Sequence, residues 1–534
     1  MNLAPNPPAT SAGPVLHRKI ARGSELLRQG QVAEAVELAQ SIAGAYPDQP
    51  QALAFAAEAC RLKGDLAAAL AWIDKAIAAG GDPQHKIKRA WLLSRMYRRD
   101  EIPAFAAQIE KDAGNDALVL WQLGKLHYHH NRLRDAIGLY ERALAIRGDH
   151  PGWRYDLAIA RFYSGDFDEA GRELDKVLSA TPESGAVLYL RSTLRRQRAD
   201  NNNVADLEAR LDAGFRNPDD EAAALYALAK ELEDLGEYGK AFSTLEAGAR
   251  RKRGTLRYDA AQFFETLREI RSVQDADALA VPASGHDEEG AIFIVGMPRT
   301  GTTLTQRLLL QSGKVKDAGE LTDFGYLLSL AVREQQAADP SLSPIAATLR
   351  LDFAGLGRQY MRAARQMADG SPMFIDKMPV NYMYCGLIHK ALPNARIIHL
   401  VRDPLDSCYA IFKTLFFNAY DFSYDLDELG EYYIAYHQTM QHWREVMPGA
   451  ILDVRYEDLV TDTEAQARRI YDWCGLEWNP QALEVPDSRM AFATASAVQV
   501  REPVHARSVN SSRRHADALA PLAEKLAAAG VLEP

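Results

Sequence analysis

A loop near the middle of the chain has the residue types of a phosphate-binding loop. Residues 296–303 run Gly-Met-Pro-Arg-Thr-Gly-Thr-Thr, so four residues separate two glycines and a hydroxyl ends the motif. This is the spacing of the loop that binds nucleoside triphosphates, except that Thr302 stands where that loop has lysine. The missing lysine argues against ATP or GTP hydrolysis, while Arg299 supplies a cation. The loop therefore suits a 5′-phosphate that carries one further small anion.

The elements that must position this loop follow from the apolar pattern. Residues 291–295 are apolar and mostly β-branched or aromatic, which predicts a buried strand, and residues 303–310 predict a helix. A strand, a Gly-containing loop and a helix form an anion cradle, because loop N–H groups and the helix N-terminus face the phosphate. A second apolar strand is expected at 397–401, with Arg402 at its end and a helix at 405–413.

From about residue 292 to residue 519 the chain resembles the sulfotransferases that use 3′-phosphoadenosine 5′-phosphosulfate (PAPS). Its spacing is similar to that of protein-tyrosine sulfotransferases and of bacterial relatives fused to tetratricopeptide repeats. The resemblance implies an α/β P-loop-like domain with a central parallel sheet, with PAPS as co-substrate and no metal. It assigns the 5′-phosphosulfate contacts to Pro298, Arg299, Thr300, Gly301, Thr302 and Thr303.

The resemblance also assigns the 3′-phosphate of the nucleotide to Arg402, whose planar guanidinium can bind phosphate bidentately. The family usually has a serine eight residues later, where this chain has Ala410. Ser407 lies one helical turn earlier on a similar face, and we expect it to substitute.

Further nucleotide contacts are implied near the end of the domain. Tyr456 resembles an adenine-contacting tyrosine, and Ser496 and Val500 resemble other nucleotide contacts. The family's closing clamp, often Gly-Lys/Arg-Trp, is replaced by Asn-Ser-Ser at 510–512. Arg513 and Arg514 follow directly, and we expect them to supply the cation of this clamp.

Three residues are the candidate catalytic groups. Glu320 lies 21 residues after Arg299, as the catalytic glutamate does in tyrosylprotein sulfotransferases, and is the candidate general base. A tyrosine acceptor has a pKa of ~10, so it needs such a base at neutral pH. Lys377 resembles the family's lysine at the transferring group, and Lys377 and Arg299 would face the charge on the leaving bisphosphate.

Each of these residues also has a structural interpretation. Glu320 could be a carboxylate at a helix N-terminus, Lys377 a solvated surface lysine, and Arg402 an ion-pair partner of a nearby aspartate. His399 lies within the expected strand, so it is interpreted as a packed core histidine.

The first half of the chain predicts an all-α solenoid of tetratricopeptide repeats. Turn residues and a following alanine recur with a period of ~34 residues, which is typical of these repeats. Residues 191–217 depart from the pattern, as a degenerate repeat or an insertion. The repeats either support the rest of the chain or bind a protein or peptide, with the acceptor among the candidates. The turns lie at Gly30, Gly64, Arg99, Asn131, Gly165 and Gly236, and the alanines at Ala35, Ala69, Ala104, Ala136, Ala170 and Ala241.

The whole chain divides into four expected parts: a disordered start (1–14), the repeats (15–253), a linker (254–289) and the sulfotransferase domain (290–525). A net charge of −10 argues against a general nucleic-acid binder. No apolar run predicts a membrane span, no segment has the pattern of a secretory signal, and four scattered cysteines favour a reducing cytoplasm. The oligomeric state is left open.

The leading hypothesis is a cytoplasmic PAPS-dependent sulfotransferase that modifies a hydroxyl, with protein or peptide tyrosine as the first candidate. Small molecules, glycans and lipids stay open as acceptors, because a fold does not determine the acceptor. Two competing hypotheses are a P-loop nucleotide kinase and a non-catalytic repeat scaffold with a decayed nucleotide site.

Overall fold

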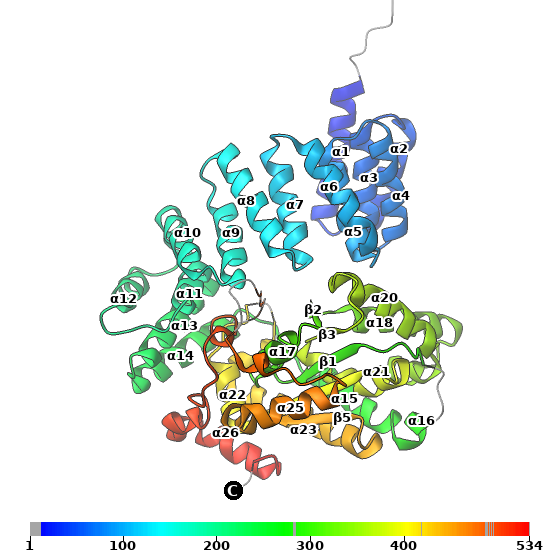
Figure 1. Cartoon of the computed structure of the whole chain (residues 1–534). Coiled ribbons are helices and arrows are strands. Elements are labelled where there is room, and N and C mark those ends of the chain that lie inside the picture. Colours follow the sequence, from blue (N-terminus) through cyan, green and yellow to red (C-terminus); the bar gives the residue numbers. More distant parts are fainter. Residues whose placement is uncertain are drawn as a thin grey trace, which may run out of the picture. The chain divides into compact units, whose positions relative to one another are not determined.

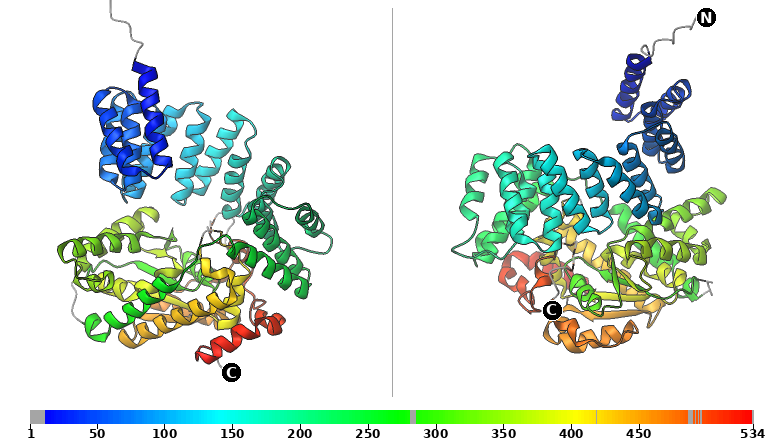
Figure 2. Two further views of the ribbon diagram at one scale, coloured as in Figure 1. Left: turned by 180° about the vertical axis from the view of Figure 1, so that it is seen from behind. Right: turned by 45° about the horizontal axis from the view of Figure 1, so that its top comes forward.

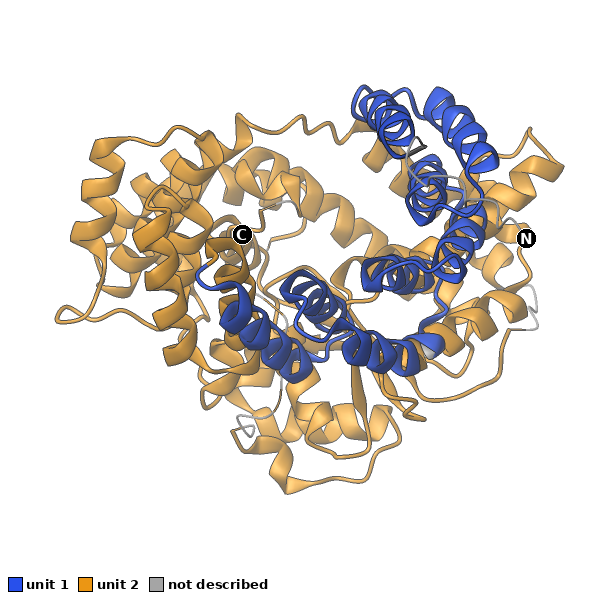
Figure 3. Ribbon diagram, turned by 90° about the horizontal axis from the view of Figure 1, so that it is seen from above, with its two compact units in different colours: residues 1–149 blue, residues 150–534 orange. Residues whose placement is uncertain are grey.

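The computed structural model of the chain describes residues 12–280, 285–417, 419–485, 490, 492, 494 and 496–532. The chain separates into two compact units, residues 1–149 and residues 150–534 (Figure 3). Residues 1–11, most of the expected disordered start, lie outside the described residues, and the first helix begins at Ala12.

The first unit consists of paired helices, as the ~34-residue period predicts (Figure 1). The turn between α3 and α4 needs Gly64, which has a φ of +90° and ends α3 in the left-handed conformation. Ala69 and Ala76 of α4 are fully buried, because helices approach closely there. The helices are α1 (Ala12–Arg28), α2 (Val32–Ala45), α3 (Pro50–Lys63), α4 (Leu66–Ala78), α5 (Pro83–Arg95), α6 (Ile102–Ala113), α7 (Ala117–His129) and α8 (Leu133–Arg147).

The second unit begins with further repeat helices. The segment that departs from the repeat pattern contains the end of α11, an irregular turn at 194–203 and the short helix α12. The expected linker at 254–289 carries the helices α15 and α16. The helices are α9 (Pro151–Ser164), α10 (Phe167–Ala180), α11 (Gly185–Thr193), α12 (Val204–Ala213), α13 (Pro218–Asp234), α14 (Tyr238–Arg253), α15 (Ala261–Val273) and α16 (Ala276–Ala280).

A five-stranded parallel sheet follows, with the order β2-β3-β1-β4-β5. This confirms the predicted α/β domain with a central parallel sheet. Phe293 of β1 lies opposite Asp376 of β3 and Ile397 of β4, so β1 occupies the middle of the sheet. The strands are β1 (Ala291–Gly296), β2 (Lys316–Gly319), β3 (Phe374–Asp376), β4 (Arg396–Val401) and β5 (Ile451–Arg455).

Helices cover both faces of the sheet, which explains the continuous apolar run in β1. Phe293 and Val295 belong to one hydrophobic cluster, and Ile292 and Ile294 belong to another on the opposite face. Helices α18 and α20 line the first face and α17 and α25 the second (Figures 1 and 2). The helices are α17 (Thr302–Leu310), α18 (Asp323–Ala338), α19 (Pro344–Ala347), α20 (Phe353–Met367), α21 (Cys385–Ala391), α22 (Pro404–Phe412), α23 (Leu426–Val446), α24 (Tyr456–Thr461), α25 (Thr463–Trp473) and α26 (Ala516–Ala528).

The last repeat helices share a hydrophobic core with the sheet domain. Ala223 and Tyr226 of α13 and Phe242 of α14 lie in the same buried cluster as Phe293 of β1. The Tyr226 hydroxyl donates a hydrogen bond of 3.1 Å to the carbonyl oxygen of Phe412 at the end of α22. These helices therefore form part of the fold that carries the site.

Among the described residues, no helix is both long enough and apolar enough to cross a bilayer.

Candidate active site

The loop at 296–301 leaves β1 and enters α17, as predicted from the flanking patterns. Gly301 caps the helix with a φ of +98°, and a Cβ at this position would lie 2.8 Å from Cδ2 of Tyr456. Arg299 also has a positive φ, of +69°. The first N–H groups of α17 have no acceptor within the helix, so they face outward together with the positive end of its dipole. The local geometry is that of an anion cradle.

Two guanidiniums lie beside this cradle, and neutral oxygens accept their hydrogen bonds. Arg299 donates to Ser496 Oγ and, at 2.8 Å, to Gln499 Oε1. Arg402 donates to the carbonyl oxygens of Arg299 (2.9 Å) and Ser508 (2.7 Å).

The charges of the two arginines are poorly compensated by nearby carboxylates. Burial lowers the pKa of Arg299, which the nearby charge of Arg402 lowers further. Arg402 is 4% exposed, and its one ion pair among the described residues joins it to Asp406 at 3.8 Å. The Nε atoms of both arginines are buried without a hydrogen-bond partner in the described part of the chain. Desolvated cations of this kind favour an anionic ligand.

A pocket of about 120 Å³ brings many of the predicted nucleotide contacts together. The Tyr456 ring forms part of its wall and lies 4.8 Å below the Arg402 guanidinium, a cation–π contact. The predicted residues that line the pocket are Arg299, Gly301, Thr302, Thr303, Arg402, Tyr456, Ser496 and Val500.

The other predicted nucleotide contacts lie around this pocket. Pro298 and Thr300 are buried in the loop, where Thr300 Oγ1 donates to the Met297 carbonyl at 2.7 Å. Ser407 is fully buried on α22, and its Oγ has no hydrogen-bond partner among the described residues. It lies one turn before Ala410, which lines the pocket.

The two arginines expected in the closing clamp lie on an exposed turn. Arg513 and Arg514 are both solvent-exposed, and the Arg514 guanidinium lies 5.1 Å above the Tyr238 ring. Ser511 of the same turn lines the pocket, whereas these two side chains are absent from the lining formed by described residues. Their role in a clamp stays a prediction.

Glu320 and Lys377 form an ion pair at the ends of two adjacent strands. Glu320 directly follows β2, and Lys377 directly follows β3. The Lys377 side chain is 3% exposed and the Glu320 side chain is 40% exposed, so a buried ammonium holds a carboxylate that solvent can reach. The backbone N–H of Lys377 also donates to the Gly319 carbonyl at 3.0 Å, which fixes the two strand ends together.

Asp376, which no sequence motif singled out, supports this pair. Its buried carboxylate accepts hydrogen bonds from the Tyr360 hydroxyl (2.8 Å), the Asn381 amide (3.2 Å) and the backbone N–H of Leu321 (3.2 Å). Burial raises the pKa of Asp376 to about 8, against the opposing effect of these hydrogen bonds. Because Leu321 follows Glu320, Asp376 positions the segment that carries the candidate base. The sequence signal that could have identified Asp376 is its position among the apolar residues of a buried strand.

His399 is buried in β4 and belongs to a chain of hydrogen bonds that reaches the phosphate loop. Its Nδ1 lies 2.6 Å from Asp453 Oδ1, and its Nε2 lies 2.5 Å from the Tyr436 hydroxyl. Arg444 donates to the Asp453 carboxylate at 2.7 and 3.0 Å. The backbone N–H of Met297, in the loop, lies beside the Tyr436 hydroxyl and lowers its pKa, against the larger effect of burial, which raises it.

The protonation states of Asp453 and His399 determine which group donates and which accepts in each hydrogen bond of this network. Burial tends to raise the pKa of Asp453, but the hydrogen bonds from His399 and Arg444 outweigh it and hold that pKa below its usual range. Burial lowers the pKa of His399. A neutral His399 therefore donates from Nδ1 to the aspartate and accepts the Tyr436 proton at Nε2. The Tyr436 hydroxyl then presents its oxygen to the Met297 N–H beside it, so the network supports the start of the loop.

Repeat helices also supply residues beside the pocket. Glu233 at the end of α13 accepts hydrogen bonds from Lys413 Nζ at 2.9 and 3.1 Å and from the Tyr409 hydroxyl at 3.2 Å. Lys413 lines the pocket. This contact joins residues 180 positions apart, so no local pattern could predict it.

Comparison with known proteins agrees with this geometry. A family model described as the sulfotransferase family matches residues 291–480. Models described as tetratricopeptide repeats match residues 20–83 and 127–194. Among the described residues, no group of three or more His, Cys, Asp or Glu side chains is arranged to hold a metal ion.

Three curated proteins illustrate the similarity. An uncharacterised protein of Aquifex aeolicus is 27% identical over 75% of this chain and 54% of its own length. A protein-tyrosine sulfotransferase of Drosophila melanogaster is 25% identical over 36% of this chain and 39% of its own. The omega-hydroxy-beta-dihydromenaquinone-9 sulfotransferase of Mycobacterium bovis is 29% identical over 19% of this chain and 28% of its own. The matches thus span about half or less of these relatives. Residues 291–480 form a domain of the sulfotransferase family, and tetratricopeptide repeats precede it in the chain.

Proposed function

We propose that this protein transfers the sulfuryl group of PAPS to a hydroxyl, and that the acceptor is tyrosine in a protein or peptide. The observation that carries the proposal is the arrangement at one edge of the sheet. Four adjacent strands, β2, β3, β1 and β4, are followed in turn by Glu320, Lys377, the phosphate loop and Arg402. The carboxyl ends of parallel strands share one edge, which is where ligands of α/β domains bind.

The proposed donor site divides between the loop and the strand β4. The loop N–H groups and the start of α17 are suited to the 5′-phosphosulfate. Arg402 and Ser407 are suited to the 3′-phosphate, because the buried Nε of Arg402 and the buried hydroxyl of Ser407 each lack a partner among the described residues and can donate to it. Tyr456 offers an aromatic face to the adenine.

PAPS supplies the sulfuryl group and departs as adenosine 3′,5′-bisphosphate. In the proposed step, Glu320 accepts the proton of the acceptor hydroxyl as that oxygen bonds to sulfur. The bond between sulfur and the bridging phosphate oxygen breaks, and its electron pair leaves with the bisphosphate. Lys377 and Arg299 stabilise the negative charge that develops on the transferring and leaving groups.

Tyrosine is proposed as the acceptor on two grounds: the spacing of Glu320 from Arg299 and the similarity to the Drosophila protein-tyrosine sulfotransferase. The repeats, which generally mediate contacts between proteins, are proposed to recruit the acceptor or a partner. The similarity to the mycobacterial enzyme favours a second candidate, a small hydroxylated lipid or metabolite as acceptor.

The test is transfer from sulfur-labelled PAPS by the full chain to a host-cell extract, followed by identification of the labelled molecules. We expect label on protein tyrosine. Label confined to small molecules would favour the second candidate, and no labelled product from a protein that binds adenosine 3′,5′-bisphosphate would refute sulfuryl transfer. ATP hydrolysis that depends on magnesium would instead favour a nucleotide kinase.

Glu320→Gln tests the proposed base. We expect this variant to bind adenosine 3′,5′-bisphosphate as the unchanged protein does and to lose at least ~100-fold in turnover, the range of general base catalysis. Glu334→Gln, which removes an exposed carboxylate from α18, is the matched control. Full turnover in Glu320→Gln would eliminate this residue as the base.

A further inference from the structure

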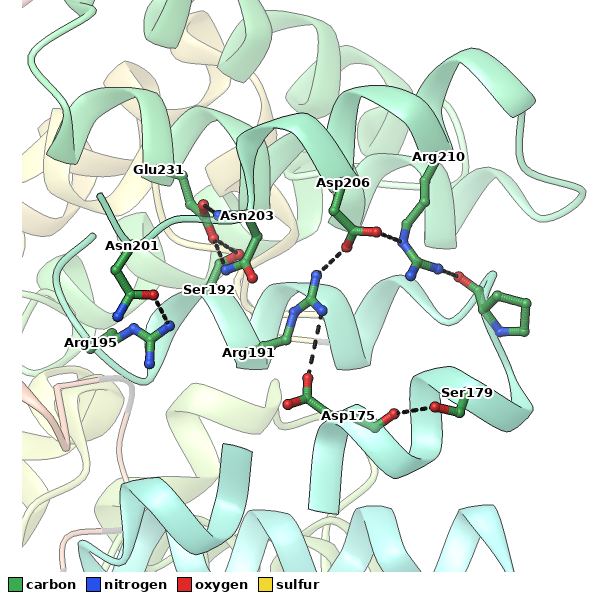
Figure 4. A network of polar contacts seen from close by, with 11 residues as sticks. Asp175, Ser179, Arg191, Ser192, Arg195, Asn201, Asn203, Asp206, Arg210 and Glu231 are labelled. Carbon is green, nitrogen blue, oxygen red and sulfur yellow. Dashed lines mark hydrogen bonds and ion pairs between the residues drawn. The ribbon is translucent and has the colours of Figure 1, made fainter. Parts of the chain in front are cut away.

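The irregular segment of the repeats is held rigidly by a buried polar network (Figure 4). Glu231 of α13 is fully buried and accepts hydrogen bonds from Ser192 Oγ (2.6 Å), from the Asn203 backbone N–H (2.6 Å) and from the Asn203 amide (2.7 Å). Both ends of the turn at 194–203 are thereby attached to one helix. A buried carboxylate with three donors costs free energy if any partner is lost, so the turn is preorganised.

Further contacts to α13 hold the middle of the turn. The backbone N–H of Gln197 donates to Asp234 at 2.8 Å. Lys230 Nζ donates to the carbonyl oxygens of Ser192 (2.6 Å) and Arg195 (2.5 Å). These contacts use backbone atoms of the turn, so they leave its arginine side chains outside the network.

The same turn presents three arginines to solvent. Arg195, Arg196 and Arg198 are all exposed, and within the described residues none of them forms an ion pair with a carboxylate. The one side-chain contact among them is a hydrogen bond of 2.7 Å from Arg195 to Asn201 (Figure 4). Three cations that form no ion pair within the described residues lie within four positions and repel one another, and the turn, which also carries the exposed Asp200, holds them together.

These arginines line a pocket of about 860 Å³ that the segment 498–507 closes on another side. This segment adds two more arginines. Arg501 is held by the carbonyl oxygens of Ala497, Tyr163 and Met490, and Arg507 pairs with Glu502.

The pocket is therefore rich in guanidiniums in a chain whose net charge is −10. Three acidic residues also line it: Asp234 is paired with Lys230 at 2.7 Å, Glu502 is paired with Arg507, and the exposed Asp200 is outnumbered by the five arginines. Planar guanidiniums bind phosphate and sulfate groups bidentately. The size of the pocket and the arginines on two of its sides suit a ligand with several such groups.

We infer that this pocket is a second anion-binding site, separate from the candidate nucleotide pocket, for a small ligand that carries two or more phosphate or sulfate groups. The two pockets adjoin at Glu502, which lines both, but their cationic walls differ: the loop 296–303 and Arg402 line the nucleotide pocket, and the turn 194–201 lines the second one. The inference does not rest on the proposed sulfuryl transfer.

The test is calorimetric titration of the full chain with inorganic tripolyphosphate at constant ionic strength. Saturating adenosine 3′,5′-bisphosphate is present, so that the phosphate loop is occupied. We expect one bound tripolyphosphate per chain. The triple substitution Arg195→Gln, Arg196→Gln and Arg198→Gln should weaken this binding at least ~10-fold, because it removes charge-assisted hydrogen bonds. The substitutions leave the hydrogen bonds of Glu231 intact, so the triple variant should have the melting temperature of the unchanged protein.

A control protein makes the result decisive. It carries Arg28→Gln, Arg172→Gln and Arg268→Gln, which remove the same charge from exposed arginines elsewhere. It should bind tripolyphosphate as the unchanged protein does. Equal binding by the turn variant and the unchanged protein, or equal weakening in the turn variant and the control protein, would overturn the second site.

Competing ligands define the chemistry that the pocket accepts. Displacement of tripolyphosphate by sucrose octasulfate would show that sulfate groups are accepted, and its failure would restrict the ligand to phosphates. If hexaglutamate displaced tripolyphosphate and bound with the same affinity, the assignment would be overturned, because the pocket would then be a surface for acidic peptides.

Discussion

The guanidinium of Arg402, at the end of β4, donates a hydrogen bond of 2.9 Å to the backbone carbonyl of Arg299 in the phosphate loop. The same guanidinium donates to the carbonyl of Ser508 at 2.7 Å. One cation therefore joins a strand end, the loop and the segment that closes the pocket. These two acceptors are neutral, and the one ion pair of Arg402 among the described residues, with Asp406, is 3.8 Å long, so much of its charge is available to an anion.

The first prediction concerns the planar guanidinium of Arg402. Arg402→Lys keeps the charge but loses the geometry that bridges the loop, the Ser508 segment and a phosphate. Loss of a charge-assisted hydrogen bond costs about 1.5–3 kcal/mol, so adenosine 3′,5′-bisphosphate should bind ~10- to 100-fold more weakly in calorimetry. Arg468→Lys, at an exposed ion pair on α25, is the control. Equal affinity in Arg402→Lys would show that this side chain does not hold the nucleotide.

The second prediction tests the chain of hydrogen bonds from Arg444 to the loop. Tyr436→Phe removes one hydroxyl, which leaves His399 Nε2 without its partner and takes away the oxygen beside the Met297 N–H. A buried group without its partner costs about 1–3 kcal/mol. We expect weaker binding of adenosine 3′,5′-bisphosphate, because the start of the loop is no longer fixed.

Tyr471→Phe is the matched control for this change. It removes another buried hydroxyl, which donates to the Leu308 carbonyl at 2.8 Å, away from the loop. Both variants should lose stability to denaturant, and only Tyr436→Phe should lose affinity for the nucleotide. Equal effects on affinity would mean that the hydroxyl acts through general stability alone.

The third prediction is a pH dependence that comes from Asp376. Burial raises its pKa to about 8 in the folded protein, above the usual value of an unfolded aspartate. The folded state therefore binds the proton more tightly. The stability that this proton contributes is complete below about pH 4 and is lost as the pH rises through about 8.

Asp376→Asn removes this titration while keeping the shape of the side chain. Between pH 5 and pH 8 the melting temperature of the unchanged protein should fall relative to that of Asp376→Asn. Asp352→Asn, at the exposed cap of α20, is a control that should follow the unchanged protein. Parallel curves for the unchanged protein and Asp376→Asn would show that Asp376 is ionised throughout this range.

The elements around the phosphate loop were predictable from local patterns. The apolar run of β1 and the change to helical spacing after Thr302 are visible in the sequence, and both elements lie where they were expected. Arg402 could be placed because it ends an apolar strand. In each case the residues of one continuous segment are enough to predict the element.

Contacts between distant segments left no such signal. Asp376 supports Leu321 through a hydrogen bond across 55 residues, and Tyr360 reaches it from α20. The apolar residues of α13 and α14 fit the repeat pattern equally well whether they pack on another repeat or on the sheet domain. That Tyr226 belongs to the core of the sheet domain therefore needed the structure.

The last prediction concerns the smallest part of the chain that folds. Because α13 and α14 share a core with the sheet domain, a fragment of residues 285–534 would expose the apolar surface that Tyr226 and Leu267 cover and would leave Lys413 without Glu233. We expect this fragment to aggregate or to melt without a cooperative transition. A fragment of residues 150–534, which is one compact unit, should melt cooperatively and bind adenosine 3′,5′-bisphosphate.

Circular dichroism melts and calorimetry of the two fragments decide between these outcomes. In the fragment 150–534, Tyr226→Ala should lower stability by about 3–5 kcal/mol, as truncation of a buried aromatic side chain does. Tyr238→Ala, at a half-buried position at the start of α14, should cost less than half as much. A fragment 285–534 that folds cooperatively and binds the nucleotide with full affinity would mean that the repeats only adjoin the domain. Its failure, together with a folded fragment 150–534, would make the helices between residues 150 and 284, α15 included, a structural part of the enzyme.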